Sequence, residues 1–269
     1  MMIHRHFDGK EKEAPIKKRE TYSIDLLNRK IAKGKKRKVV VYAGTRNLYS
    51  DMVLAVKSLL NHNPNFKVYL LIEDEKFPYY LPDCVECIDV SKQTWFKSGG
   101  LNYWNHWSYM VLLRAAYTKM FPEYDRILSL DVDTIVMEDI SPLWDYDMTD
   151  YYIAGVPEYM VRHDIEEYIN FGVCMYNLDK IRKDGIDDTV IRLLNIMYFK
   201  FPEQDAMNKE MLGHVLVIPK RYNDGYCCGT SDDPAIVHLV GAAKSLNPRK
   251  HLQDDYADVP WEEILKKRK

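Results

Sequence analysis

Two aspartates with one residue between them, Asp131 and Asp133, close an apolar run that begins at Arg126. If this run is a strand that continues, residues two apart point to the same side of it. Two carboxylates held within a few ångströms repel each other unless one is protonated or a cation lies between them. Carboxylate oxygens are the ligands that hard divalent ions prefer. The pair predicts a metal site, with an ordinary surface turn as the alternative.

Three further places carry residues suited to chemistry. A helix predicted over residues 108–121 contains Arg114. If Arg114 faces the site, its planar guanidinium suits an acidic group or a ribose, and a solvated side chain is the alternative. Glu203, Gln204 and Asp205 follow a proline where a new helix should begin, so capping of that helix competes with a catalytic role for the two acidic residues. His238 interrupts a short apolar segment, and a buried core histidine is the alternative to a metal ligand.

The surrounding pattern predicts the elements that position these residues. Residues 39–43 form a β-branched run, residues 49–61 show helical spacing, and residues 67–72 form a second apolar run. A strand, a crossover helix and another strand indicate a parallel sheet, whose ligand lies beyond the carboxyl ends of the strands. Residues 43–47 therefore line a candidate site. Further strands are expected over 84–90, 126–136, 151–156 and 170–178, an aromatic loop over 95–109 and a helix over 188–197.

The composition indicates one large domain with a small-molecule partner. The 269 residues are 46% hydrophobic, enough for a sizeable core, and the net charge of -2 gives no sign of a nucleic-acid partner. Five cysteines are too few for a disulfide framework, which indicates a reducing compartment and a cytoplasmic protein. Cys84 and Cys87 could hold zinc with Cys227 and Cys228, but the second pair lacks the usual spacing.

The two ends are expected to lie outside a main domain over residues 39–250. Residues 1–38 form a charged extension with a short helix around 21–33, and residues 251–269 form a polar, basic tail. No stretch is long and apolar enough to span a bilayer. The four basic residues 266–269 suggest weak contact with the anionic inner face of a membrane as the alternative to a solvated tail.

Several separated motifs together resemble one family, over roughly residues 39–244. They are Val41-Tyr42-Ala43-Gly44-Thr45-Arg46-Asn47, Arg114 in its helix, Leu128-Ser129-Leu130-Asp131-Val132-Asp133, Tyr168-Ile169-Asn170-Phe171-Gly172-Val173, Glu203-Gln204-Asp205 and Val237-His238-Leu239-Val240-Gly241-Ala242-Ala243-Lys244. In order and spacing they resemble glycosyltransferase family 8, the retaining transferases that include glycogenin and bacterial lipooligosaccharide galactosyltransferases. The resemblance implies a GT-A fold, an α/β sandwich with a mostly parallel, Rossmann-like sheet.

The resemblance also implies a UDP-sugar donor, a hexose such as glucose or galactose, and a glycan or other hydroxyl acceptor. Asp131, Asp133 and His238 would bind Mn²⁺, with Mg²⁺ as the alternative, since an imidazole beside oxygen ligands favours manganese. Other family positions contact the donor. They imply that Ala43, Thr45, Asn47 and Val132 line the nucleotide pocket, that Arg114 lies near the donor, and that Gly241 and Lys244 contact the diphosphate.

By the same resemblance, Gln204 lies beneath the sugar ring, while Asp205 and Asn170 hold sugar hydroxyls. Glu158 stands where the family often has aspartate, and Gly44-Thr45-Arg46 replaces an aspartate-containing turn. Because an amide is a poor nucleophile, a front-face displacement is expected, with Asp205 as a nucleophile left open. Two alternatives remain at this point: a sugar-1-phosphate nucleotidyltransferase, whose Gly-rich basic turn is missing here, and a scaffold without turnover.

Overall fold

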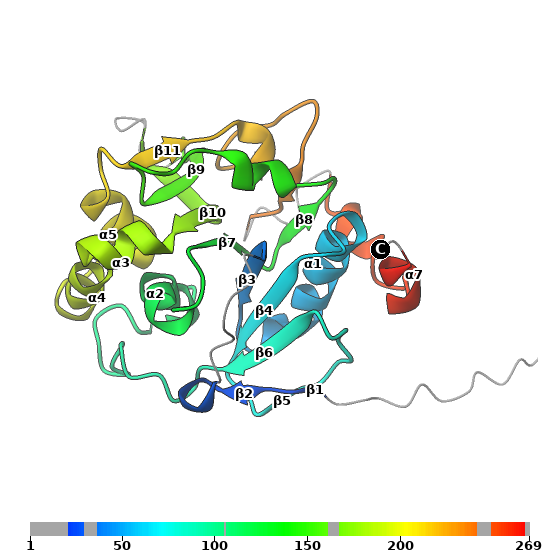
Figure 1. Ribbon diagram of the computed structural model, residues 1–269, viewed down its shortest axis with the longest axis horizontal. Helices are drawn as coiled ribbons and strands as arrows, with labels where there is room; N and C mark the ends of the chain where they lie inside the picture. Colours follow the sequence, from blue (N-terminus) through cyan, green and yellow to red (C-terminus); the bar gives the residue numbers. More distant parts are fainter. Residues whose placement is uncertain (1–20, 30–36, 105, 161–166, 241–248, 267–269) are drawn as a thin grey trace, which may run out of the picture.

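A large sheet runs through the centre of the computed structural model, which describes residues 21–29, 37–104, 106–160, 167–240 and 249–266 (Figure 1). The spatial order of its strands in this part of the chain is β11 (Val215–Val217), β9 (Ile153–Pro157), β10 (Ile169–Asn177), β7 (Arg126–Leu130), β3 (Val39–Ala43), β4 (Lys67–Ile72), β6 (Val85–Asp89) and β2 (Ile24–Asp25). Strand β10 is antiparallel to both neighbours, and the other neighbouring pairs are parallel. The predicted α/β fold with a mostly parallel sheet is confirmed.

Apolar side chains on the two faces of the sheet form two separate cores. In β3, Val40 and Tyr42 belong to one core, whereas Val39 and Val41 belong to the other. This alternation is expected of a strand with both faces covered.

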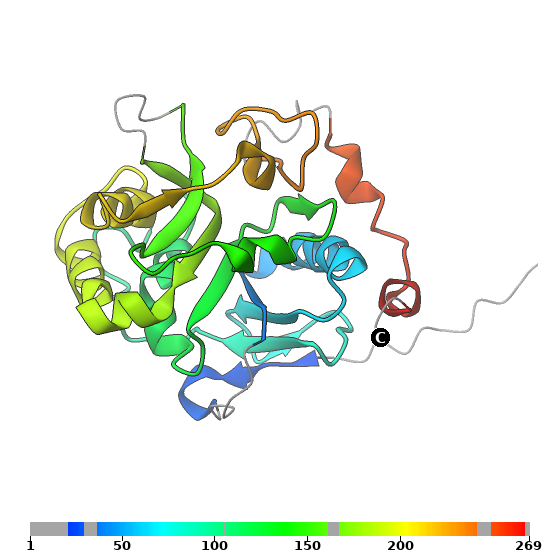
Figure 2. The same cartoon turned by 45° about the horizontal axis from the view of Figure 1, so that its top comes forward.

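Helices cover both faces, so the sheet lies between two helical layers (Figures 1 and 2). Helix α1 (Tyr49–His62) packs on the first face. The second face carries η3 (Tyr109–Ala116), α2 (Tyr117–Met120), α3 (Leu178–Asp184), α4 (Ile186–Ile196) and α5 (Pro202–Glu210). The segment expected as one helix over 108–121 is thus a 3₁₀ helix followed by one α-helical turn.

The polar residues predicted to form a site lie at one edge of the sheet, where the carboxyl ends of the central strands meet. The predicted strand, helix and strand are β3, α1 and β4, and β3 pairs in parallel with both β4 and β7. Their carboxyl ends therefore share an edge, where a ligand of an open α/β sheet binds. Because β10 runs in the opposite direction, with Val173 opposite Leu130, its first residues lie at that same edge.

A smaller sheet is attached to this edge and consists of β12 (Asp224–Gly225), β13 (Ile236–His238) and β8 (Thr134–Val136). Strand β8 follows β7 after three residues, and β13 pairs with it antiparallel, with His238 opposite Thr134. A 3₁₀ turn, η5 (Lys220–Asn223), leads into β12. A second short turn, η4 (Ser141–Asp145), follows β8.

Part of the predicted N-terminal extension is attached to the sheet, and the helix expected around residues 21–33 is not formed over 21–28. Strand β1 (Thr21–Tyr22) pairs with β5 (Lys76–Phe77), β2 pairs with β6, and η1 (Leu26–Asn28) follows. The side chain of Arg29 is paired with Glu123, and its guanidinium lies 4.8 Å from the ring centre of Tyr69. A charge-rich stretch that looked solvated therefore packs at the end of the sheet.

The expected polar tail also packs on the domain as far as it is described. It contains α6 (His251–Asp254) and α7 (Trp261–Leu265), and both Trp261 and Ile264 are buried in the core beside α1. The ammonium group of Lys57 donates to the backbone carbonyls of Tyr256 and Ala257, both at 3.0 Å. Residues 267–269, most of the basic run, lie outside the described residues. Within the described residues, no helix combines the length and the apolar character that crossing a membrane requires.

Candidate active site

Asp131, Asp133 and His238 come together at the edge of the sheet. One potential ligand atom of each lies within 4.8 Å of the others. The two aspartates flank the turn between β7 and β8, which Thr134 closes by donating its backbone N–H (3.1 Å) and its hydroxyl (2.7 Å) to the carbonyl of Asp131. His238 Nε2 lies 3.6 Å from Asp131 Oδ2 and 3.3 Å from Asp133 Oδ1. The predicted set of metal ligands is therefore brought together, although a turn and not a continued strand aligns the carboxylates.

The ring of His238 is buried against the backbone of Gly172. A Cβ atom at position 172 would lie 2.0 Å from His238 Cε1, so only glycine leaves room for the imidazole. Burial alone would lower the pKa of His238, but the carboxylates of Asp133 and Asp131 outweigh it and raise that pKa above its ordinary value. The site thus favours a positive charge between the two carboxylates, which a proton or a metal ion can supply.

A chain of buried side chains leads from His238 into the sheet. His238 Nδ1 lies 2.9 Å from Asn223 Oδ1, and Asn223 Nδ2 donates to Asn170 Oδ1 at 3.0 Å. Asn170 in turn accepts from the Gly172 N–H at 2.8 Å and donates to Glu158 Oε2 at 2.8 Å. Asn170, Glu158 and His238 are predicted site residues, but Asn223 is not, because an isolated asparagine at the end of a 3₁₀ turn carries no motif.

Arg114 lies beside the cluster of Asp131, Asp133 and His238 and joins it to α5. Its guanidinium is buried and pairs with Asp131, and it donates to Glu203 Oε1 at 2.6 Å. Burial opposes the charge of Arg114, but Asp131 and Glu203 outweigh it and raise its pKa. Burial also raises the pKa of Glu203, which Arg114 offsets only in part. Arg114 therefore orients a metal-site carboxylate, in addition to the donor contact expected from the sequence.

The first turn of α5 presents Gln204 and Asp205 beside Tyr168. Gln204 Oε1 accepts from the Phe171 N–H at 3.1 Å, and its Nε2 lies 3.3 Å from the Tyr168 hydroxyl. Asp205 accepts from that hydroxyl at 2.6 Å and from the Phe201 N–H at 2.9 Å. Asp205 therefore caps the start of α5, the role that competed with a catalytic one.

The turn after β3 lies next to the cluster of Asp131, Asp133 and His238. Val41 of β3 is opposite Ser129 of β7, so Ala43 and Asp131 follow at the same edge. The next residues form η2 (Arg46–Leu48), with the Thr45 hydroxyl donating to Asn47 Oδ1 at 2.6 Å. Val132, also expected in the nucleotide pocket, is buried in the adjacent turn. Gly241 and Lys244, the expected diphosphate contacts, lie outside the described residues.

Comparison with known proteins identifies the family. The sequence model described as Glycosyl transferase family 8 matches residues 39–245. The chain belongs to glycosyltransferase family 8. Among curated relatives of this family-8 chain, glycosyltransferase GlyA of Streptococcus pneumoniae is 26% identical over 84% of the chain and 34% of its own length. The lipopolysaccharide 1,2-glucosyltransferase of Escherichia coli is 24% identical over 61% of the chain and 58% of its own length.

Solved structures support the GT-A fold of this family-8 chain. The galactosyltransferase LgtC, solved in complex with donor and acceptor sugar analogs, superposes with a TM-score of 0.61 at 19% identity, covering 84% of this chain and all of LgtC. The chain therefore spans the length of LgtC but only a third to three fifths of the two curated relatives. The family and the fold follow from these likenesses.

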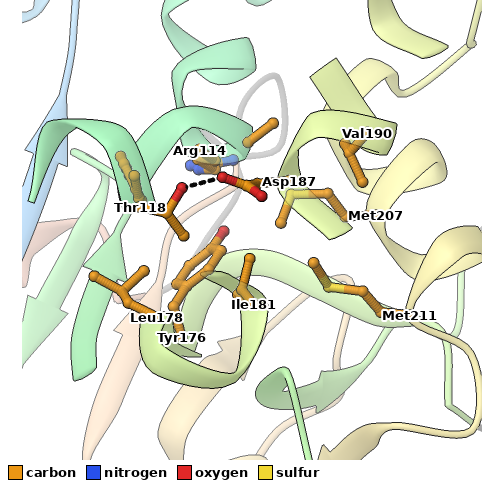
Figure 3. A pocket seen from close by; sticks show the side chains of 11 residues that line it. Arg114, Thr118, Tyr176, Leu178, Ile181, Asp187, Val190, Met207 and Met211 are labelled. Carbon is orange, nitrogen blue, oxygen red and sulfur yellow. Dashed lines mark hydrogen bonds between the residues drawn. The ribbon is translucent and has the colours of Figure 1, made fainter. Parts of the chain in front are cut away.

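Two cavities adjoin the site of the family-8 chain. The smaller, of about 10 Å³, lies behind Arg114 and is lined by Tyr176, Asp187 and Met207 (Figure 3). It has room for one water molecule and not for a substrate. The larger, of about 480 Å³, lies beside Asp205 and falls in the size range of small-molecule sites. Its walls are Tyr168, Tyr198, Phe199, Lys200, Asp205, Asn208, Lys209 and Leu212.

Proposed function

We propose that the protein is a metal-dependent retaining glycosyltransferase that moves a hexose, glucose or galactose, from a UDP-sugar to a hydroxyl group of a glycan or other acceptor. The observation that carries the proposal is the cluster of Asp131, Asp133 and His238, in a chain that belongs to glycosyltransferase family 8. The names of a relative, a glucosyltransferase, and of a structural neighbour, a galactosyltransferase, support a hexose donor.

The proposed cofactor is Mn²⁺, with Mg²⁺ as the alternative. The two carboxylates and one imidazole of the cluster are a donor set that suits manganese, and their closeness is favourable only with a positive charge between them. When bound, the ion would offset the negative charge that develops on the leaving diphosphate. Lys244 and Gly241 are proposed to contact the same diphosphate. Arg114, which pairs with Asp131, would keep that carboxylate oriented toward the ion.

The donor sugar is proposed to lie over the start of β10 and the first turn of α5. Gln204 would face the ring, while Asn170, Glu158 and Asp205 would hold its hydroxyls. The nucleotide would extend along Ala43, Thr45, Asn47 and Val132 at the carboxyl end of β3.

Front-face displacement is the proposed route to retention. Gln204 offers only an amide, and both oxygens of Asp205 accept hydrogen bonds from Tyr168 and Phe201, which argues against Asp205 as a nucleophile. The acceptor hydroxyl would then attack from the side of the leaving phosphate, whose oxygen receives the hydroxyl proton.

The acceptor is proposed to be a glycan that extends toward the cavity of about 480 Å³ beside Asp205. Aromatic side chains such as Tyr198 and Phe199 stack on the apolar faces of sugars. Tyr198 is 70% exposed, so its replacement by alanine should leave the fold intact. We expect Tyr198→Ala to raise the KM for the acceptor and leave the KM for the donor unchanged; an unchanged acceptor KM would place the acceptor elsewhere.

The test of the proposed function is release of UDP from a panel of UDP-sugars by the purified protein, with Mn²⁺ and with a chelator, in the absence of acceptor. Manganese-dependent release from one sugar is the expected result and would name the donor. Binding of UDP without release would indicate an enzyme that requires its acceptor. Neither binding nor release would favour a scaffold without turnover or a different nucleotide.

A further inference from the structure

We propose that Asn223 is a positioning residue that fixes which nitrogen of His238 is available to a metal ion. The inference rests on the proposed metal site and adds a residue to it that no family motif named above contains. Asn223 has no exposed surface, and His238 is only 4% exposed. Water therefore cannot take over the hydrogen bonds of either side chain, and the orientation of the Asn223 amide decides the arrangement.

The orientation of the Asn170 and Asn223 amides is set at the end of the hydrogen-bonded series that is farthest from His238. The backbone N–H of Gly172 can only donate, and it lies 2.8 Å from Asn170 Oδ1. The carboxylate of Glu158 can only accept when ionised, and its Oε2 lies 2.8 Å from Asn170 Nδ2. Both neighbours require the same orientation of the Asn170 amide, so its oxygen faces Asn223.

The rest of the arrangement follows from that orientation. Asn223 must present its amide nitrogen to Asn170 Oδ1, at 3.0 Å, and this turns its amide oxygen toward His238 Nδ1, at 2.9 Å. An amide oxygen cannot donate, so His238 Nδ1 carries the hydrogen. The lone pair of a neutral His238 is then on Nε2, the nitrogen that faces Asp131 and Asp133. Metal-binding histidines generally depend on such a partner at the other ring nitrogen.

The same series of hydrogen bonds connects two parts of the proposed active site. Glu158 and Asn170, proposed to hold hydroxyls of the donor sugar, also orient Asn223 through fixed hydrogen bonds. Every bond in the series has one defined donor and one defined acceptor, so reversing a single amide would place two acceptors or two donors face to face. The sugar subsite and the metal ligand are therefore held by one network.

The test is Mn²⁺ affinity of the full chain, measured from the free-ion signal in electron paramagnetic resonance. Asn223→Ala removes the acceptor at Nδ1 and should weaken Mn²⁺ binding about 10- to 100-fold. Asn223→Asp keeps an oxygen at Nδ1 but places its second oxygen against Asn170 Oδ1, so it should reduce stability. A folded Asn223→Asp should still bind Mn²⁺ within about threefold of the unmodified protein, because a carboxylate is also a common partner of a metal-bound histidine. Circular dichroism checks that each variant is folded.

The matched control is Asn63→Ala. Asn63 is also buried and its side chain is also held by hydrogen bonds, three of them, with Leu59, Glu138 and Ile140, but it lies outside the candidate site. Its replacement should reduce stability without changing Mn²⁺ affinity.

Three results would overturn the inference: unchanged affinity in Asn223→Ala, equal weakening in a folded Asn223→Asp, or equal weakening in Asn63→Ala. Failure of the unmodified protein to bind Mn²⁺ would instead refute the proposed metal site itself, and the inference with it.

Discussion

At the residue scale, Asp131 and Asp133 share the cluster but differ in their other contacts. Asp131 also pairs with the buried Arg114, so Asp131→Asn leaves part of a buried positive charge uncompensated. Asp133→Asn leaves the pair of Arg114 and Asp131 intact and is the variant to test first. We expect it to lower manganese-dependent UDP release by more than about 100-fold, beyond the loss typical of an outer-shell change, with a folded protein by circular dichroism. Full activity in either variant would remove the case for the metal site.

Gly172 is required by the ring of His238 and not by its own backbone conformation. A methyl group at this position would lie 2.0 Å from the imidazole, and a buried ring can move only by giving up its bonds to Asn223 or the carboxylates. We expect Gly172→Ala to weaken Mn²⁺ binding at least tenfold and to reduce stability by about 1–3 kcal/mol, as for other overpacked sites. Calorimetric titration with Mn²⁺ and thermal unfolding measure the two effects. Gly99→Ala is a suitable control, because nothing lies within 4 Å of the added Cβ atom.

Gln204 is the polar group proposed to face the reacting sugar. Its replacement by alanine removes the amide. It also leaves the Phe171 N–H without its acceptor, because that N–H donates to Gln204 Oε1 at 3.1 Å. If the amide stabilises charge that develops in the transition state, turnover should fall by about 100-fold while donor affinity changes little. Comparison of kcat with the Kd for the UDP-sugar donor tests this. A kcat equal to that of the unmodified protein would mean that Gln204 does not lie at the reacting face.

Site residues that belong to a motif with a recognisable spacing could be predicted from the sequence, whereas those outside any motif could not. Asp131 and Asp133 follow the last residue of β7, and His238 ends β13, so their positions at the same end of the sheet follow from the pattern of the strands. Asn223 lies 15 residues before His238, and only the pairing of β12 with β13 brings the two together. Its role depends on the direction of an amide, which no sequence pattern encodes.

At the element scale, apolar and β-branched runs predicted the central strands, because a strand that is buried on both faces is apolar along its whole length. At the ends of the chain, charged residues did not indicate correctly which segments are exposed to solvent. Lysine and arginine around residues 21–38 suggested a solvated extension, yet β2 joins the sheet and Arg29 lies over Tyr69. Long basic side chains can pack their stems and planes on aromatic rings, so their presence does not exclude burial.

The packing of α7 on α1 gives a direct test of the C-terminal segment. Trp261 is 9% exposed, packs in the core beside α1, and donates its indole N–H to the Tyr80 carbonyl at 3.0 Å. We expect Trp261→Ala to lower the free energy of unfolding by about 3 kcal/mol, the lower end for a buried tryptophan. Trp104→Ala, at a side chain that is 78% exposed, should change it little. Equal and small effects in urea unfolding would indicate that α7 is not docked in solution.

At the scale of the whole molecule, the site couples protonation, metal binding and stability. The pKa of His238 is raised because the two carboxylates outweigh its burial. A raised folded-state pKa stabilises the folded protein below the unfolded value of about 6.5, and this stabilisation is lost as pH rises through the folded-state pKa. Without metal, the contribution of His238 is therefore fully present below about pH 6.5 and is lost as the pH rises through its raised folded-state pKa.

Metal binding has the opposite pH dependence, because the ion replaces the proton on the imidazole. A saturating ion at about 100 times its Kd adds roughly 2.7 kcal/mol of stability, and competition from protons reduces this at low pH. The increase in Tm on addition of Mn²⁺ should therefore grow from pH 6 to pH 8, whereas the His238 contribution to metal-free stability can only fall or stay constant as the pH rises. Thermal unfolding at pH 6, 7 and 8, with Mn²⁺ and with a chelator, measures both trends. A manganese effect independent of pH would mean that His238 is not among the ligands, whereas an effect that grows with pH but vanishes in Asp133→Asn would assign it to this cluster.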